Sequence, residues 1–379
     1  MRATFVLGRI AGVRVGVHWS VLFIFGIIAF GLARGRLPQT YPGRAWAVYW
    51  AAGVCTAVVF FASLLAHELA HAVVARRNGV EVDDIVLWLL GGAARLKSEA
   101  SSPGRELRIA GVGPLVSLLL GGLFTLATWL LELASVSVIV REMAAWLAGI
   151  NVLLAVFNAL PAAPLDGGRL LRAFLWWRTG DRLRATAGAT AAGRVLGWLL
   201  VVVGLVAFVR TNSFGGLWLA LIGWFLITAA TAEGRQAQLR SALAGVPVRD
   251  AMTPGPLTVP ADTTVAGFLT DVRYRYRHSA FPVTEDGATV GLVTLDSARK
   301  VPEAGARSTT VADVMVPLSR TTVVEPDSPL ADLLPRMEPG AEHRVLVVDH
   351  GRLVGIVSLS DVSRRVTWLM NAPGRRGGP

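Results

Sequence analysis

The residues best suited to chemistry in this sequence are two histidines and a glutamate inside one apolar run. The segment FASLLAHELAHAVVARR places His67, Glu68 and His71 in the pattern H-E-x-x-H. Residues four apart share one face of an α-helix, so the two imidazoles can bind one zinc ion. Glu68 then stands beside the metal, where it can take a proton from a bound water. The pattern predicts a hydrolytic zinc centre.

A pair of hydrogen-bonded histidines in a helix bundle is the structural alternative. A charged side chain at the centre of a membrane helix costs about 2.5–3.5 kcal/mol on insertion scales. Three ionisable residues in so apolar a run therefore need a partner. A metal ion in a water-filled cavity provides one, which favours the metal site.

A third zinc ligand is expected from another helix end, because catalytic zinc usually has three protein ligands and one open position. The best candidate is Asp166, in the segment NALPAAPLDGGR at 158–169. We predict that it ends the fourth apolar run, on the same side of the membrane as the end of the second. Its prolines break the helix and let the carboxylate turn back toward the metal. By itself, Asp166 could equally be a helix cap or a turn residue.

The elements that must position these residues are long apolar runs. The chain has 379 residues, 53% of them hydrophobic, which exceeds what soluble proteins show. Six runs are long enough to cross a bilayer as helices. Their approximate limits are 17–34, 46–75, 108–131, 143–161, 190–209 and 215–232.

The distribution of positive charge predicts the orientation of these runs. Arginines and lysines gather before the first run, between the second and third, and between the fourth and fifth. The opposite side carries only Arg34, Arg36, Arg44, Arg141 and Arg210. The positive-inside rule then places both termini in the cytoplasm. The net charge of +11 is explained by these flanking arginines, and we expect no nucleic-acid partner.

The segment 80–97 does not fit a membrane span. Val82 to Leu90 is strand-like, Gly91-Gly92 is a turn signal, and Ala93 to Lys97 can return as a second strand. We predict a β-hairpin at the cytoplasmic edge of the membrane. Backbone that is not helical is tolerated there only if it lines a cavity or pairs with another segment.

The chain beyond about residue 240 reads as a soluble α/β tandem repeat, in segments 246–300 and 309–369. VRDAMTP at 248–254 matches VADVMVP at 311–317. Gly287 and Gly291 align with Gly351 and Gly355. Each copy is expected to contain a short strand, a helix, two strands and a helix. The sequence thus predicts a membrane domain over 1–240, two repeat domains, and a disordered tail over 371–379.

HELAH in one span and N-x-x-P-x-x-x-L-D-G at the end of a later one carry a resemblance to a known family. The chain resembles the site-2 proteases, in the prokaryotic subgroup with a C-terminal pair of CBS domains, over almost its whole length. The resemblance implies an intramembrane zinc metalloprotease with one zinc ion. It implies His67, His71 and Asp166 as ligands, Glu68 as catalytic acid/base, and Asn158 near the reacting carbonyl or the substrate backbone.

The resemblance also implies the partners. The hairpin resembles the family's membrane re-entrant β-loop, which holds substrate as an added strand. The substrate would be a transmembrane protein, for example a membrane-anchored transcription regulator or anti-sigma factor, and the enzyme a multi-pass protein of the cell membrane. The expected fold is a multi-span α-helical membrane domain with a soluble α/β CBS pair.

The CBS pair resembles a sensor of adenine nucleotides (ATP, ADP or AMP). The ribose signature is a hydroxyl followed three residues later by Asp, and Ser358 with Asp361 fits it. In the first copy Asp296 follows Thr294 one residue too early, and Ser297 takes the expected place. We expect one nucleotide site. The alternative is a dimerisation module without ligand, which would make the chain a homodimer.

Two other functions are alternatives to a protease. A CBS-gated transporter or channel would carry ionisable residues along a pathway through several spans, whereas this sequence concentrates them at one site. A non-catalytic receptor of the same fold has no need of Glu68, which is present. Both alternatives are therefore less favoured than the protease.

Overall fold

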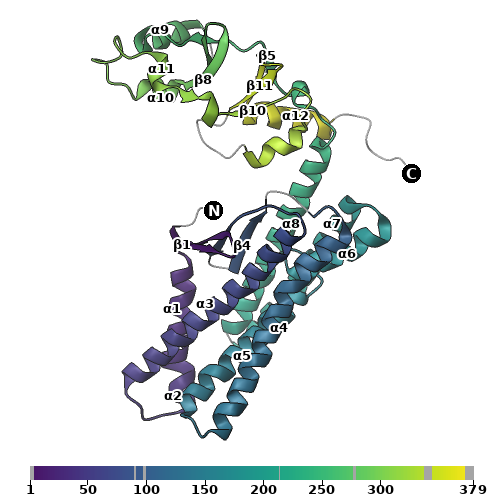
Figure 1. The fold of residues 1–379 in the computed structure, drawn as a ribbon. Helices are drawn as coiled ribbons and strands as arrows, with labels where there is room; N and C mark the ends of the chain where they lie inside the picture. The colour runs from purple at the N-terminus through teal and green to yellow at the C-terminus, as the bar shows by residue number, and fades with distance from the viewer. Residues whose placement is uncertain are drawn as a thin grey trace. The chain divides into compact units, whose positions relative to one another are not determined.

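A computed structural model describes residues 4–88, 91–96, 100–212, 214–275, 279–336 and 344–371. The chain divides into two compact units, Met1–Arg235 and Gln236–Pro379 (Figure 1). The expectations for Leu89, Leu90, Lys97 and residues 372–379 of the tail lie outside the described residues.

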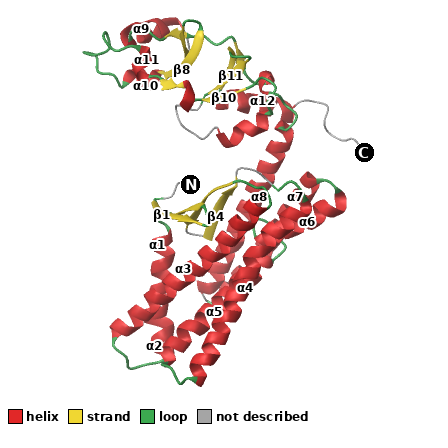
Figure 2. Ribbon diagram, viewed as in Figure 1, coloured by secondary structure: helices red, strands yellow, loops and turns green. Residues whose placement is uncertain are grey.

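The first unit is a helical bundle with a small sheet at one end (Figure 2). Its helices are α1 Val21–Phe30, which continues as a π-helical stretch Gly31–Arg36 and α2 Leu37–Thr40, then α3 Trp46–Arg77, α4 Pro103–Leu133, α5 Val138–Ala159, α6 Asp166–Thr179, α7 Arg182–Thr211 and α8 Phe214–Leu243. Six of the described segments are long and apolar enough to cross a membrane: Val21–Thr40, α3, α4, α5, α7 and α8. The predicted six spans are therefore confirmed.

The outer faces of these helices are apolar, as a lipid environment requires. Leu119 on α4 is 63% exposed and Val209 on α7 is 81% exposed. Small residues let two spans pack closely. A methyl group at Gly197 or Gly204 of α7 would overlap the backbone of α8 at Gly223 or Gly216. Such close backbone approach is how membrane helices associate when water does not drive them together.

The sheet combines the chain start with the predicted hairpin. Its strands are β1 Phe5–Ile10, β2 Val13–Val17, β3 Val82–Trp88 and β4 Gly91–Leu96, in the order β1-β2-β3-β4. Strand β2 runs parallel to β3, and the other pairs are antiparallel. Val13 and Ile85 pack on Ala72 of α3, which fixes the sheet to that helix.

Two sequence expectations in this region were wrong. The first apolar run was placed from residue 17, but Val17 closes β2 and the helix begins only at Val21. Gly91-Gly92 was assigned to the turn of the hairpin, but these residues begin β4, where they pair with Trp88 and Leu87. A neighbouring side chain explains the glycine at position 92, as described below, whereas Gly91 has a positive φ of 136°.

The second unit consists of two four-stranded sheets. The first copy contributes β5 Thr253–Pro254, β6 Val259–Pro260, α9 Val265–Arg275, β7 Ala280–Glu285, β8 Ala288–Thr294 and α10 Leu295–Arg299. The second contributes α11 Val311–Val314, β9 Val316–Pro317, β10 Thr322–Val324, a 3-10 helix Leu330–Arg336, β11 Val345–Asp349, β12 Arg352–Val357 and α12 Leu359–Asn371. Where the second copy was expected to have its first α-helix, the described residues thus form a 3-10 helix, bounded by Pro329 and interrupted by Pro335.

The two copies exchange strands. The sheet orders are β6-β7-β8-β9 and β10-β11-β12-β5, so each copy lends its first short strand to the other. A methyl group at Gly355 would overlap Met252, and one at Gly291 would overlap Met315. These are the residues that align between the repeats, so the repeated Met and Gly form one of the contacts that join the copies.

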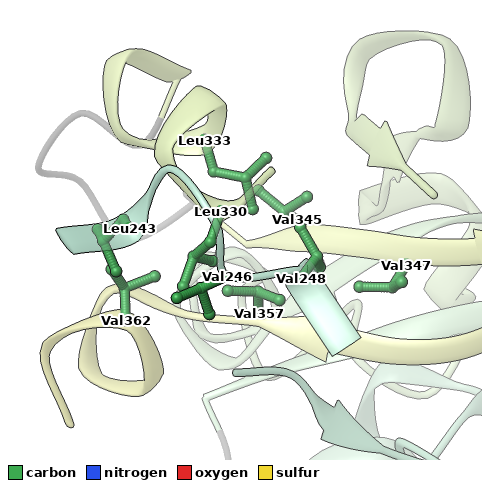
Figure 3. Close-up of a cluster of buried hydrophobic side chains, with 9 residues drawn as sticks. All are labelled: Leu243, Val246, Val248, Leu330, Leu333, Val345, Val347, Val357 and Val362. Carbon is green, nitrogen blue, oxygen red and sulfur yellow. The ribbon is translucent and has the colours of Figure 1, made fainter. Parts of the chain in front are cut away.

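Each sheet has its own core. Phe268 and Phe281 pack edge to face in the first, with ring centroids 5.5 Å apart. In the second, nine buried residues from α8, β11, β12, α12 and the intervening segments form one cluster (Figure 3). Leu243, at the end of α8, is fully buried in this cluster.

Candidate metal centre

Three side chains from two helices converge on one point. His67 and His71 are on α3, and Asp166 is the first residue of α6. The two Nε2 atoms lie 3.2 Å apart, and Asp166 Oδ2 lies 3.2 Å from His67 Nε2 and 3.0 Å from His71 Nε2. The three side chains are 3%, 8% and 13% exposed. Among the described residues this is the group of His, Cys, Asp and Glu that could hold a metal ion.

The far side of each imidazole is anchored to α4. His71 Nδ1 donates to the Ile109 carbonyl at 2.7 Å, and His67 Nδ1 lies 2.8 Å from Ser117 Oγ. A carbonyl oxygen can only accept, so Nδ1 of His71 carries its proton and the neutral ring presents a lone pair at Nε2. Such an outer hydrogen bond is the usual support of a metal-ligating histidine.

The donor set fits a zinc ion. Around tetrahedral zinc with bonds of about 2.0–2.1 Å, neighbouring ligand atoms lie about 3.3 Å apart, close to the spacing found here. At a distance of about 3 Å, the negative carboxylate oxygen and the lone pair on Nε2 of a neutral imidazole repel each other. A cation between them removes this repulsion. The chemistry of these atoms therefore suits a cation bound at their centre.

Asp166 reaches the histidines because of the glycines that follow it. Methyl groups at Gly167 and Gly168 would overlap the backbone of residues 159–163, so only glycine lets α6 begin directly on that loop. The prediction that Asp166 ends the fourth span was wrong: α5 ends at Ala159, and Asp166 starts a separate helix.

Two glycines make room for the site's side chains. A methyl group at Gly113 of α4 would overlap Nε2 of both histidines. A methyl group at Gly92 of β4 would overlap the Glu68 carboxyl, which therefore lies directly against the hairpin backbone. Glu68 thus stands beside the three converging groups and in contact with the strand at the edge of the sheet.

Asn158 is not part of this cluster. It lies next to the last residue of α5, and its Nδ2 donates to the Leu154 carbonyl at 3.0 Å. Within the described residues it makes no hydrogen bond to His67, His71 or Asp166. Sequence reasoning also missed the support given by Ile109 and Ser117, because a backbone carbonyl and a lone serine in an apolar helix carry no recognisable pattern.

A second candidate site lies within the CBS pair. A cavity of about 450 Å³ is lined by residues of both copies, including Ser279, Phe281, Arg344, Ser358, Asp361 and Arg364. Asp361 accepts hydrogen bonds from the backbone N–H and the hydroxyl of Ser358, and pairs with Arg364 at 2.8 Å. In the first copy Thr294 and Ser297 form the matching helix cap with a hydroxyl in place of the carboxylate.

Comparisons with known proteins give a consistent picture. The family model of Peptidase family M50 matches residues 55–134 and 120–203, and that of the CBS domain matches 248–303 and 311–367. A protein of Mycobacterium tuberculosis named "Putative zinc metalloprotease Rip3" is 46% identical over 368 residues, which cover 97% of this chain and 93% of that protein. A zinc metalloprotease of Methanocaldococcus jannaschii is 29% identical over 364 residues, or 96% of each chain.

A solved site-2 protease from Methanocaldococcus jannaschii is also similar, with 27% identity and a TM-score of 0.42 over 61% of this chain and 95% of that one. The identity over nearly the full length of the mycobacterial relative, with the two family matches, decides the assignment. The chain belongs to peptidase family M50 and is a multi-pass membrane zinc metalloprotease of the site-2 type with a C-terminal CBS pair.

Proposed function

We propose that the chain hydrolyses a peptide bond in or near the transmembrane helix of another membrane protein, using one zinc ion held by His67, His71 and Asp166. The observation that supports this most strongly is the convergence of two imidazole Nε2 atoms and a carboxylate oxygen within 3.2 Å of one another. Glu68, which is adjacent but outside that triangle, is then the general base.

Zinc supplies Lewis acidity, which brings the pKa of a bound water toward 7 and stabilises the negative charge of the transition state. Proton transfer and substrate positioning are then carried out by side chains of the protein. Glu68 accepts the proton of the attacking water and delivers it to the leaving amine. Asn158 would donate a hydrogen bond to the scissile carbonyl or the substrate backbone, which requires its amide to leave the Leu154 carbonyl.

Substrate binding would use the edge of the sheet. A helical substrate hides its carbonyls in internal hydrogen bonds, so it must unwind before it can be cut. Strand β4 is the last strand of the sheet and pairs on one side with β3. An unwound substrate segment can add to the other side of β4 by β-augmentation. The contact of Gly92 with Glu68 would bring that segment to the general base.

The arginine distribution supports a location of the metal site, both termini and the CBS pair on the cytoplasmic side of the cell membrane. A substrate such as a membrane-anchored transcription regulator or anti-sigma factor would then release its cytoplasmic part on cleavage.

The CBS cavity would bind one adenine nucleotide, with Asp361 at the ribose, and this binding would regulate cleavage. A dimer formed through the CBS domains is the alternative role of that unit.

The proposal is tested with purified chain in lipid nanodiscs and a model transmembrane substrate. Glu68→Gln should retain one zinc per chain while cleavage falls about 10²–10⁴-fold, the usual contribution of a general base. His67→Ala should lose both zinc and cleavage. Full activity of Glu68→Gln would refute the mechanism. Ion or solute flux through the wild-type chain without proteolysis would support the transporter alternative instead.

A further inference from the structure

Four residues on one face of α4 contact either the two histidines or the helix that carries Asp166. They are Glu106, Ile109, Gly113 and Ser117, spaced three, four and four residues apart. Ile109 and Ser117 contact the two histidines, and Gly113 leaves space for both Nε2 atoms. Glu106 contacts neither histidine, yet it belongs to the same face and is only 2% exposed.

Glu106 instead contacts the helix that carries Asp166. Arg169 Nε donates to Glu106 Oε1 at 3.1 Å, and Arg172 Nη2 donates to the same oxygen. Both arginines are on α6, three and six residues after Asp166. Arg172 Nη1 also donates to Glu233 of α8 at 3.2 Å. The carboxylate of Glu106 therefore holds the first two turns of α6 against α4.

This arrangement has a direct consequence for Asp166. It lies at the very start of α6, after a loop, and the two residues that follow it are glycines, which supply no side-chain contacts. The position of its carboxylate thus depends on the contacts that hold α6 against α4, which are those of Arg169 and Arg172 with Glu106. A carboxylate pairing with two arginines away from water is strongly directional, since planar guanidinium groups bind at fixed angles.

We infer that Glu106 is a positioning residue: through Arg169 and Arg172 it sets the distance between Asp166 and the two histidines, and so the affinity of the site for zinc. This inference rests on the proposed ligand set. Glu106 would touch neither zinc nor substrate. Without the Glu106 carboxylate, α6 is no longer held against α4, so the affinity of the site for zinc should fall. Loss of such a support of a metal ligand typically lowers metal affinity about 10–100-fold.

The test measures zinc affinity by chelator competition and the visible spectrum of the Co²⁺-loaded chain, which reports the number and geometry of ligands. Glu106→Gln should lower zinc affinity about 10–100-fold and change the Co²⁺ spectrum. The matched control is Glu142→Gln, which removes a carboxylate of α5 that pairs with Arg36 at 3.5 Å. Glu142 lies near the start of α5, which carries none of the three proposed ligands, and its loss should leave both readouts unchanged.

A double mutant distinguishes positioning from a general loss of structure. If Glu106 acts through Asp166, then adding Glu106→Gln to Asp166→Ala should change zinc affinity less than about twofold further, because the two effects are coupled. A full additional loss in that background overturns the inference. A lower melting temperature with an unchanged Co²⁺ spectrum overturns it as well, since Glu106 would then only stabilise the fold.

The remaining outcomes separate this inference from the proposed function. Reduced zinc affinity of Asp166→Ala with wild-type affinity of Glu106→Gln overturns the inference alone. Wild-type zinc affinity of Asp166→Ala overturns the ligand set and the inference together. Should Glu106→Gln fail to fold, Arg169→Lys keeps the positive charge but removes the Nε donor. It should still shift the Co²⁺ spectrum, and an unchanged spectrum would count against the inference.

Discussion

The Glu68 carboxyl lies where a side chain at Gly92 would have to be, so the proposed general base and the edge strand of the sheet are in direct contact. This contact joins two parts of the site that are separated in the chain by more than twenty residues. It explains why the hairpin has glycine at this position even though Gly92 is paired with Leu87 within the ladder rather than in a turn.

Gly92→Ala should therefore impair cleavage. The added methyl group must displace Glu68, and misplacement of a catalytic group by about 1 Å can cost on the order of 100-fold in rate. Zinc content should stay at one per chain, because Glu68 is not a ligand. Gly104→Ala is the control, since a methyl group there meets open space. Cleavage by Gly92→Ala at the wild-type rate would show that Glu68 can move without consequence.

Gly113→Ala should act on the metal instead of on the general base. Its methyl group would overlap Nε2 of both histidines. Overpacking of this kind costs about 1–3 kcal/mol, which would lower zinc affinity about 5- to 150-fold. Gly122→Ala, on the same helix, adds a methyl group to open space and should keep wild-type affinity. Equal zinc affinities of the two variants would contradict the geometry of the site.

The sequence contains enough information to predict the metal centre but not its supports. His67, Glu68 and His71 are close in sequence, and helical periodicity alone places them together. Asp166 could be predicted only as a candidate, because its side of the membrane and its distance from α3 depend on tertiary structure. Its location at the start of α6 was missed, since the motif's prolines favour a break and the short amphipathic helix after them is not apolar enough to stand out.

Other features could not be predicted because they depend on contacts between distant segments. Strands β1 and β2 are short and pair with each other, and they join the larger sheet only because β2 pairs with β3, some seventy residues later. In the strand exchange between the CBS copies, Met252 packs on Gly355 and Met315 packs on Gly291. The repeat itself was visible in the sequence, whereas the reason for the repeated Met and Gly was not.

Pairing of substrate with β4 leads to a prediction about two neighbouring residues. Ala93 and Ala94 pair with Val86 and Ile85 of β3. In an antiparallel ladder successive N–H groups point to opposite sides, so one of these two donates toward β3 and the other toward the open edge. Proline removes the donor in either case.

The proline that removes the edge donor should lower cleavage and raise the apparent KM, with zinc content and melting temperature close to wild type. The other proline weakens the β3–β4 pairing and should lower the melting temperature as well. Turnover would be measured with several transmembrane substrates in nanodiscs. Wild-type KM for both variants on every substrate would show that the hairpin supports the fold without pairing with substrate.

Binding of an adenine nucleotide at the CBS cavity is the last prediction. Asp361 lines a cavity of about 450 Å³ with Arg344 and Arg364, and carboxylate and guanidinium groups are of the chemical kind that binds ribose and phosphate. Titration calorimetry of the full chain with ATP, ADP and AMP should show one site per chain. Asp361→Asn should weaken binding, whereas Ser297→Ala, which alters the matching cap of the first copy, should not. A nucleotide can shift activity only by its difference in affinity for two states, so cleavage should change over the same concentration range as binding. No binding of any of the three at millimolar concentration would leave dimerisation as the role of the CBS pair.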